Sequence, residues 1–179
     1  GENSSGQLGL GDAVDRTAPT QVLTDVAHVA LGRLHVVVAR NDGTSWTWGN
    51  NSSRQLGDGT TTSRNTPGQV SGLASTTHVA AGATWTLALA GGAAYAWGEN
   101  GYGQLGDGST ADRAVPTAVP ALAGATAFDG GDNHSLARAA DGTALGWGHN
   151  GYGQLGDGTL TVRLTPVDVV GLANGVVAV

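Results

Sequence analysis

Acidic side chains recur in glycine-rich surroundings in this sequence, which is one setting in which proteins bind calcium. Asp58, Asp107 and Asp157 each follow the same Gln-Leu-Gly triplet and precede a glycine. Each loop offers only one carboxylate, however, whereas calcium takes about six to eight oxygen ligands. We therefore predict no metal site. Each aspartate is expected to hydrogen-bond its own turn or to pair with the arginine six residues further on.

The five histidines are not spaced as the ligands of a metal ion on one strand or loop would be: His28, His35, His78, His134 and His149. His35 and His134 occupy the same position of an internal repeat, so we expect them to fill a structural slot that orients a turn. A catalytic histidine needs a neighbouring nucleophile or carboxylate, and an active site is normally built once rather than repeated. We predict no catalytic residue and no enzymatic activity.

The Gly-Gln-Leu-Gly-Asp-Gly stretches are superficially similar to loops that bind phosphate. A phosphate loop needs a following helix N-terminus and usually a lysine. The chain has no lysine and no stretch with helical periodicity, so no nucleotide and no other cofactor is expected.

These residues sit within a long internal repeat, marked by Trp48, Trp97 and Trp147, each followed by a Gly-x-Asn sequence. A period of about 50 residues is typical of solenoids and propellers. A further copy without its tryptophan opens the chain at Gly1. The repeats run over 1–48, 49–97, 98–147 and the half repeat 148–179.

Four short apolar runs in each repeat must position the glycine-rich loops that recur from copy to copy. The first begins at a proline (Pro19, Pro67, Pro116 or Pro166), which suits the first residue of a strand. The third and fourth are joined by Asp-Gly or Gly-Gly, typical of a tight β-hairpin. Four antiparallel strands of about five residues form the unit of a propeller blade. The sequence therefore predicts an all-β protein, a β-propeller of four-stranded blades with about three and a half blades in the chain.

The combination Trp-Gly-x-Asn-x-x-x-Gln-Leu-Gly-x-Gly, then proline and valine, then Gly-x-x-His before the hairpin, resembles the regulator of chromosome condensation repeat. The resemblance covers the whole chain and implies a seven-bladed propeller when complete. It departs from the pattern at Trp85, where other repeats keep His35 and His134, and at Leu10, where later copies have aspartate.

Composition restricts the partners. The chain has 31 glycines, no cysteine, and eight arginines against fourteen acids, for a net charge of −6. Nucleic-acid binding depends mainly on basic residues that neutralise phosphates, so no nucleic-acid partner is expected. No apolar stretch approaches the roughly 18 residues of a membrane span. The composition favours a bacterial protein in an extracellular or cell-surface setting, and the missing initiator methionine suggests a fragment.

Three functions fit this pattern. The resemblance implies a non-catalytic scaffold that binds a protein partner. The alternatives are a regulator that acts like a guanine-nucleotide exchange factor, or a structural module of a large bacterial surface protein. We also count fourteen strands, so that two copies would supply the twenty-eight strands of a seven-bladed ring, which raises the hypothesis of a homodimer.

One face of the propeller is the expected binding site. The connections 49–66, 98–115 and 148–165 and the turns 32–34, 82–84 and 131–133 should share one side, because alternate turns of a meander do. Loops on a rigid scaffold commonly carry function, and Tyr and Arg are frequent interface anchors. The alternative for Tyr102 and Tyr152 is that each packs on the loop of the neighbouring blade. The candidate partner-binding residues are Arg33, Arg54, Trp85, Glu99, Tyr102, His149 and Tyr152.

Overall fold

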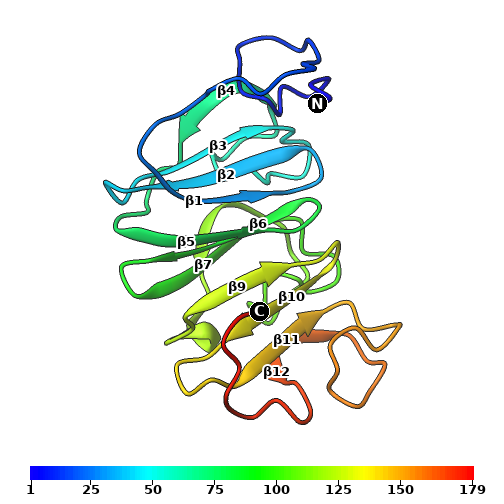
Figure 1. Cartoon of the computed structure of the whole chain (residues 1–179). Helices are drawn as coiled ribbons and strands as arrows, with labels where there is room; N and C mark the ends of the chain where they lie inside the picture. The colour runs from blue at the N-terminus through cyan, green and yellow to red at the C-terminus, as the bar shows by residue number, and fades with distance from the viewer.

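The computed structural model describes all of residues 1–179 and contains three four-stranded antiparallel sheets, each a propeller blade (Figure 1). Blade 1 holds β1 (Val26–Leu31), β2 (His35–Arg40), β3 (Ser45–Gly49) and β4 (Arg64–Gln69). Blade 2 holds β5 (Thr76–Ala81), β6 (Trp85–Ala90), β7 (Ala93–Gly98) and β8 (Arg113–Ala118). Blade 3 holds β9 (Ala127–Gly130), β10 (His134–Arg138), β11 (Ala144–Gly148) and β12 (Arg163–Asp168), after a 3-10 turn, η1 (Pro120–Leu122).

The all-β propeller prediction is confirmed, but the fourth strand of each blade lies earlier than expected. β4, β8 and β12 begin at an arginine, three residues before the proline that the sequence suggested as the first strand residue. In blade 1 the register shifts so that Asn65, Thr66 and Pro67 together face the single residue Trp48. Proline cannot donate to the ladder, and an edge strand with a bulge is where a sheet tolerates it.

The strand count is also corrected. The structure has twelve strands rather than fourteen, because the stretches around Pro19 and at Val176–Val179 form no strand. The chain therefore holds three complete blades instead of three and a half. Two copies would supply twenty-four strands, so the strand count no longer argues for a ring of two copies.

The two larger clusters of the core lie between neighbouring blades. One cluster joins blades 1 and 2 and includes Val37, Ala88 and Trp97. Another joins blades 2 and 3 and includes Leu87, Ala137 and Trp147. The small alanines let facing sheets approach closely, and the large indoles fill the space that remains. No helix of the structure is both long and apolar enough to cross a membrane.

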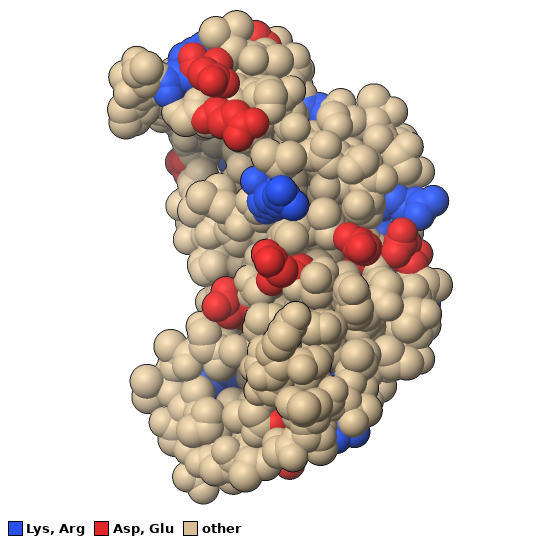
Figure 2. Space-filling model, turned by 90° about the vertical axis from the view of Figure 1, so that its right-hand side faces the viewer, with Lys and Arg blue, Asp and Glu red and all other residues tan.

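The blades are arranged as an arc. The first strands β1, β5 and β9 lie next to one another along its inner side. Figure 2 shows the molecule from the end where the third strand of each blade connects to the fourth. In this view the outline is curved and hollowed on one flank, and few charged groups interrupt a mostly uncharged surface.

Candidate functional site

The long-loop face comprises the loops 50–63, 99–112 and 149–162, between the third and fourth strands of each blade, and the turns 32–34, 82–84 and 131–133. Antiparallel pairing places these connections at the same end of every sheet, as the sequence predicts. Figure 2 views the molecule from this end.

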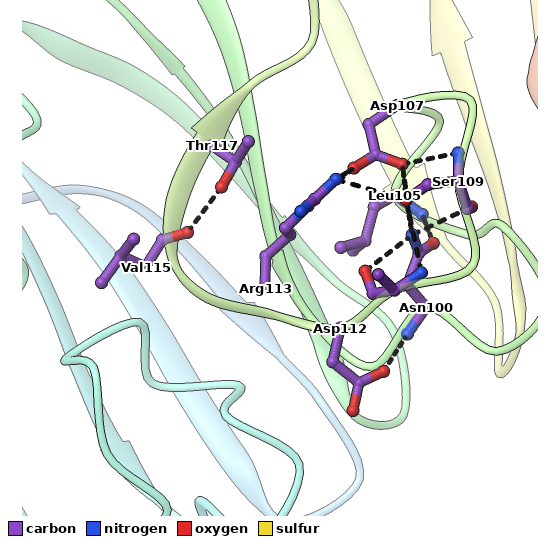
Figure 3. A network of polar contacts seen from close by, with 9 residues as sticks. Asn100, Leu105, Asp107, Ser109, Asp112, Arg113, Val115 and Thr117 are labelled. Atoms are coloured by element: carbon purple, nitrogen blue, oxygen red, sulfur yellow. Dashed lines mark hydrogen bonds and ion pairs between the residues drawn. The ribbon is translucent and has the colours of Figure 1, made fainter.

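A buried asparagine organises each long loop, as the middle copy illustrates (Figure 3). Asn100 is fully buried, and its Oδ1 accepts the backbone N–H of Leu105 at 3.0 Å. Its Nδ2 donates to Asp107 Oδ1 at 3.2 Å and to the carbonyl oxygens of Ser109 and Ala111, each at 3.1 Å. The loop is thus closed on itself by one side chain, which gives the face a rigid framework.

The aspartate of each loop is held by an arginine. Asp107 accepts the backbone N–H of Ser109 at 3.0 Å and forms an ion pair of 2.6 Å with Arg113. Partial burial acts to raise the pKa of Asp107, but hydrogen bonds from Ser109 and Arg113 outweigh it and hold the pKa below its ordinary value. The predicted pairing with the arginine six residues on is confirmed in all three long loops: Asp58 with Arg64, Asp107 with Arg113 and Asp157 with Arg163.

The copy at the start of the chain builds the same framework from a different residue. Sequence alignment places Leu10 at the aspartate position. In the structure Asp12 supplies the carboxylate, since Asn3 Nδ2 donates to Asp12 Oδ1 at 3.1 Å and Arg16 pairs with Asp12 at 2.6 Å. This loop therefore also has an ion pair between aspartate and arginine, but here the arginine follows the aspartate by four residues instead of six.

Three of the predicted site residues come together in an aromatic cluster formed by Tyr102, His149 and Tyr152. The rings of Tyr102 and His149 meet edge to face with centroids 4.9 Å apart, and those of His149 and Tyr152 lie 5.8 Å apart. Tyr152 is 90% exposed and Tyr102 is 43% exposed. The Nδ1 of His149 lies 2.6 Å from Gln154 Nε2, which fixes the ring between the two tyrosines. The cluster spans the loops of blades 2 and 3.

Other predicted residues lie apart from this cluster. Arg54 forms an exposed ion pair of 3.3 Å with Asp112, which joins the loops of blades 1 and 2. Glu99 accepts a hydrogen bond from the hydroxyl of Thr84. Arg33 is exposed and lines a cavity of about 320 Å³ with Asp132, where the turns 32–34, 82–84 and 131–133 converge.

The prediction is wrong for Trp85, which is fully buried and cannot contact a partner. Its Nε1 donates to the carbonyl oxygen of Asp132 at 3.1 Å, and its ring lies so close to Gly82 that a Cβ there would be 2.0 Å away. Trp85 is therefore a packing residue between blades 2 and 3. The equivalent His35 is also buried and hydrogen-bonds Thr86 Oγ1 at 3.0 Å, in agreement with the structural slot predicted for it.

Sequence reasoning overlooked two acidic residues of this face, Asp112 and Asp132. A signal for Asp132 was present, because the position after the turn glycine changes from Arg33 to Ala83 to Asp132 while the glycine stays. The ion pair of Asp112 with Arg54 joins two different loops, so no local sequence pattern predicts it.

Comparison with known proteins assigns the repeat. A profile of the regulator of chromosome condensation (RCC1) repeat matches residues 1–39, 42–89, 91–138 and 141–179, and a second profile of the same repeat matches residues 26–55 and 126–154. This chain belongs to the RCC1 repeat family. The long-loop frameworks described above are therefore features of RCC1 repeats in this chain.

Two groups of relatives are similar to this RCC1-repeat chain. The E3 ubiquitin-protein ligase HERC2 of human and of mouse is 39% identical over 94 residues, which cover 49% of this chain and 2% of HERC2. The crystal structure of human WBSCR16 matches with a TM-score of 0.85 and 29% identity, over 95% of this chain and 47% of that one. Yeast RCC1 (Prp20), solved bound to Kap60, matches with a TM-score of 0.81 and 21% identity, over 94% and 43%.

These matches bear on fold rather than on activity. The chain spans 2% of the curated relatives and less than half of the solved propellers. At 21% identity, Prp20 shows the fold alone. All of these relatives are eukaryotic, so they lend no support to the bacterial origin that the composition suggests, and that origin stays a prediction.

Proposed function

We propose that this RCC1-repeat chain is a non-catalytic protein-binding module that holds its partner through the aromatic cluster Tyr102–His149–Tyr152 on the long-loop face. The observation that carries the proposal is that Tyr152 is 90% exposed while a rigid loop holds its backbone in place. Large aromatic side chains at the centre of an interface commonly dominate binding energy.

The framework of the loops supports this function. Tyr152 follows Asn150, whose buried amide donates to Asp157 Oδ1 at 3.0 Å, and its own N–H donates to Gln154 Oε1 at 3.0 Å. A loop whose backbone is already held in place loses little conformational entropy on binding. The carboxylates of the loops are committed to internal hydrogen bonds and ion pairs, which favours recognition over catalysis.

The two structures of Prp20 describe binding to proteins: one holds Kap60, and the other is presented together with binding to Gsp1p and histones. These partners are those of Prp20. They support the proposal of a protein partner for this chain. The acidic composition argues against nucleic acid as the partner, and the lack of a long apolar stretch argues against a membrane.

The test begins with the partner. The purified chain is immobilised, proteins retained from an extract of the source organism are identified, and binding is then remeasured with the purified partner by calorimetry. We expect Tyr152→Ala to weaken binding by about 30-fold, equivalent to about 2 kcal/mol, without changing the melting temperature. The matched control is Val177→Ala, because Val177 is 91% exposed and its neighbour Val176 is hydrogen-bonded to Gly142, in the turn at the opposite end of blade 3.

Tyr102→Ala separates binding from packing. Its ring contacts His149 from the neighbouring blade, so we expect a smaller loss of binding and a modest loss of stability. Equal affinity of wild type and both tyrosine variants would refute the assignment of this site. Should the retained partner be a GTPase, acceleration of nucleotide release by the chain would favour the exchange-factor alternative; a chain that retains no partner would favour a structural module.

A further inference from the structure

Two histidines of neighbouring blades meet at the inner side of the arc. His28 of β1 and His78 of β5 have ring centroids 4.8 Å apart, with an angle of 39° between the ring planes. They occupy the same position of successive repeats, since each lies four residues before the turn glycine, Gly32 or Gly82. The third blade has Ala127 at this position. The pair is therefore a feature of the boundary between blades 1 and 2.

The ring nitrogens of this pair are available as ligands. The rings of His35 and His149 hydrogen-bond the side chains of Thr86 and Gln154, whereas no hydrogen bond joins the ring of His28 or His78 to another side chain. His28 Nδ1 is buried without a hydrogen-bond partner, which is costly for a polar atom. Burial, together with the closeness of His78, lowers the pKa of His28, so that its ring is neutral at pH 7. The neutral imidazole is the form that binds a metal ion.

The spacing of the rings suits two bonds to one ion. With a metal–nitrogen bond of about 2.1 Å, an in-line imidazole places its ring centre about 3.2 Å from the ion. Ring centres 4.8 Å apart then subtend an angle of about 97° at the ion. This angle lies between that of neighbouring ligands in a square-planar complex, about 90°, and that in a tetrahedral complex, about 109°. Rotation about the Cβ–Cγ bond, whose axis passes through the ring centre, reorients the nitrogens without altering the separation.

The ligand type selects the class of ion. Imidazole nitrogens suit copper, nickel and zinc, whereas calcium and magnesium take oxygen ligands. The chain has no cysteine, so no thiolate competes for such an ion. Two nitrogens leave the remaining coordination positions to water, and the ion in such an open site can exchange.

We propose that His28 and His78 form a two-histidine site for a divalent late transition-metal ion, bound most tightly as Cu²⁺, at the boundary between blades 1 and 2. Divalent copper is the expected favourite because affinities at a given nitrogen site rise from nickel to copper and fall again at zinc. The two ligands belong to different blades, so a bound ion ties β1 to β5 and stabilises the folded chain. No single strand or loop carries the pair, which is why the sequence predicted no metal site. The proposal is independent of the partner-binding site on the long-loop face.

The first test is a calorimetric titration of the full chain with Cu²⁺, on protein made without a histidine tag and stripped of metal beforehand. One site per chain is expected. His28→Ala and His78→Ala should each lower the affinity at least tenfold, because the second imidazole of a chelating pair binds at a high effective concentration. Thr77→Ala is the matched control and should keep the affinity, since Thr77 is an exposed neighbour of His78 on the same strand.

A spectroscopic readout counts the ligands. Electron paramagnetic resonance of the Cu²⁺ complex should show hyperfine splitting from two imidazole nitrogens in the wild type and from one in each alanine variant. His78→Phe keeps a ring at the boundary but removes both nitrogens. Loss of Cu²⁺ binding in His78→Phe, with the metal-free melting temperature unchanged, would separate ligation from packing and support the site.

The link between blades gives the last readout. Zn²⁺ or Ni²⁺ should raise the melting temperature of the wild type but not that of His78→Phe. Equal Cu²⁺ affinity of the wild type and both alanine variants would show an adventitious ion only, bound elsewhere on the chain, and would overturn the proposal. Loss of binding in one alanine variant but not in the other would also overturn it, because the site needs both rings.

Discussion

Replacement of Asn100 tests the framework of the long-loop face most directly, because this one side chain closes a loop from within. Asn100→Ala leaves the buried N–H of Leu105 without its acceptor and removes the donor to Asp107 and two carbonyls. An unsatisfied buried N–H costs about 1–3 kcal/mol, and each further hydrogen bond contributes about 1 kcal/mol net. We expect a loss of about 3 kcal/mol in the free energy of unfolding.

Asn100→Asp separates shape from charge. The aspartate keeps the acceptor for Leu105 but replaces the amide donor with an oxygen that faces the carboxylate of Asp107, where the present separation is 3.2 Å. Two unit charges 4 Å apart repel by about 4 kcal/mol at an effective dielectric constant near 20. Asn100→Asp should therefore be more destabilising than Asn100→Ala at pH 7, although it is the closer mimic in size.

The pH dependence of Asn100→Asp gives a second readout. Burial and the neighbouring carboxylate would raise the pKa of the new Asp side chain, so the folded state would bind more protons than the unfolded state. The stability deficit relative to wild type should then shrink as the pH falls from 7 to 5.

The assay is urea unfolding followed by tryptophan fluorescence at pH 7 and pH 5. Asn41→Asp serves as the control, since Asn41 is exposed and its replacement should change the free energy by no more than about 0.5 kcal/mol. A stability of Asn100→Asp equal to wild type, or a deficit that does not change with pH, would refute the reasoning.

Further predictions concern the inter-blade packing and the titrating groups. Gly106→Ala should unfold at a lower temperature than Gly108→Ala, because both glycines have a positive φ but only the former touches an indole; calorimetry measures both, and equal melting temperatures would contradict the importance of this contact. Burial lowers the pKa of His35 to about 4, so the unfolded state takes up a proton first and stability falls as the pH drops from 6.5 to 4. His35→Gln should reduce this slope by about one proton, and an unchanged slope would refute the assignment. The lowered pKa of Asp107 adds stability above its ordinary pKa that is lost as the pH falls; Arg113→Met should therefore move acid unfolding, followed by circular dichroism, to higher pH. Calcium should leave the melting temperature unchanged, whereas a calcium site at a hundred times its dissociation constant would add about 2.7 kcal/mol.

The features that the sequence determined are those with a local cause. The 49- and 50-residue spacing of the marker tryptophans and the hairpin signals between the third and fourth runs indicated propeller blades. The pairing of Asp107 with Arg113 could be predicted because both residues belong to one loop. Repetition strengthened each inference, since every copy shows the same pattern.

The tertiary structure decided whatever depends on neighbours that are distant in the chain. A run of β-forming residues does not specify its partner strand, and so the proline-containing strand proved to complete the preceding blade rather than to begin the next. The sequence suggested Trp85 as a partner-binding residue, yet in the structure its side chain is fully buried against blade 3. The meeting of Tyr102 with His149 likewise requires two blades to be packed side by side. Inter-blade contacts arise from burial and shape across about 50 residues of sequence, and no local pattern encodes which side chains they cover and which they leave exposed.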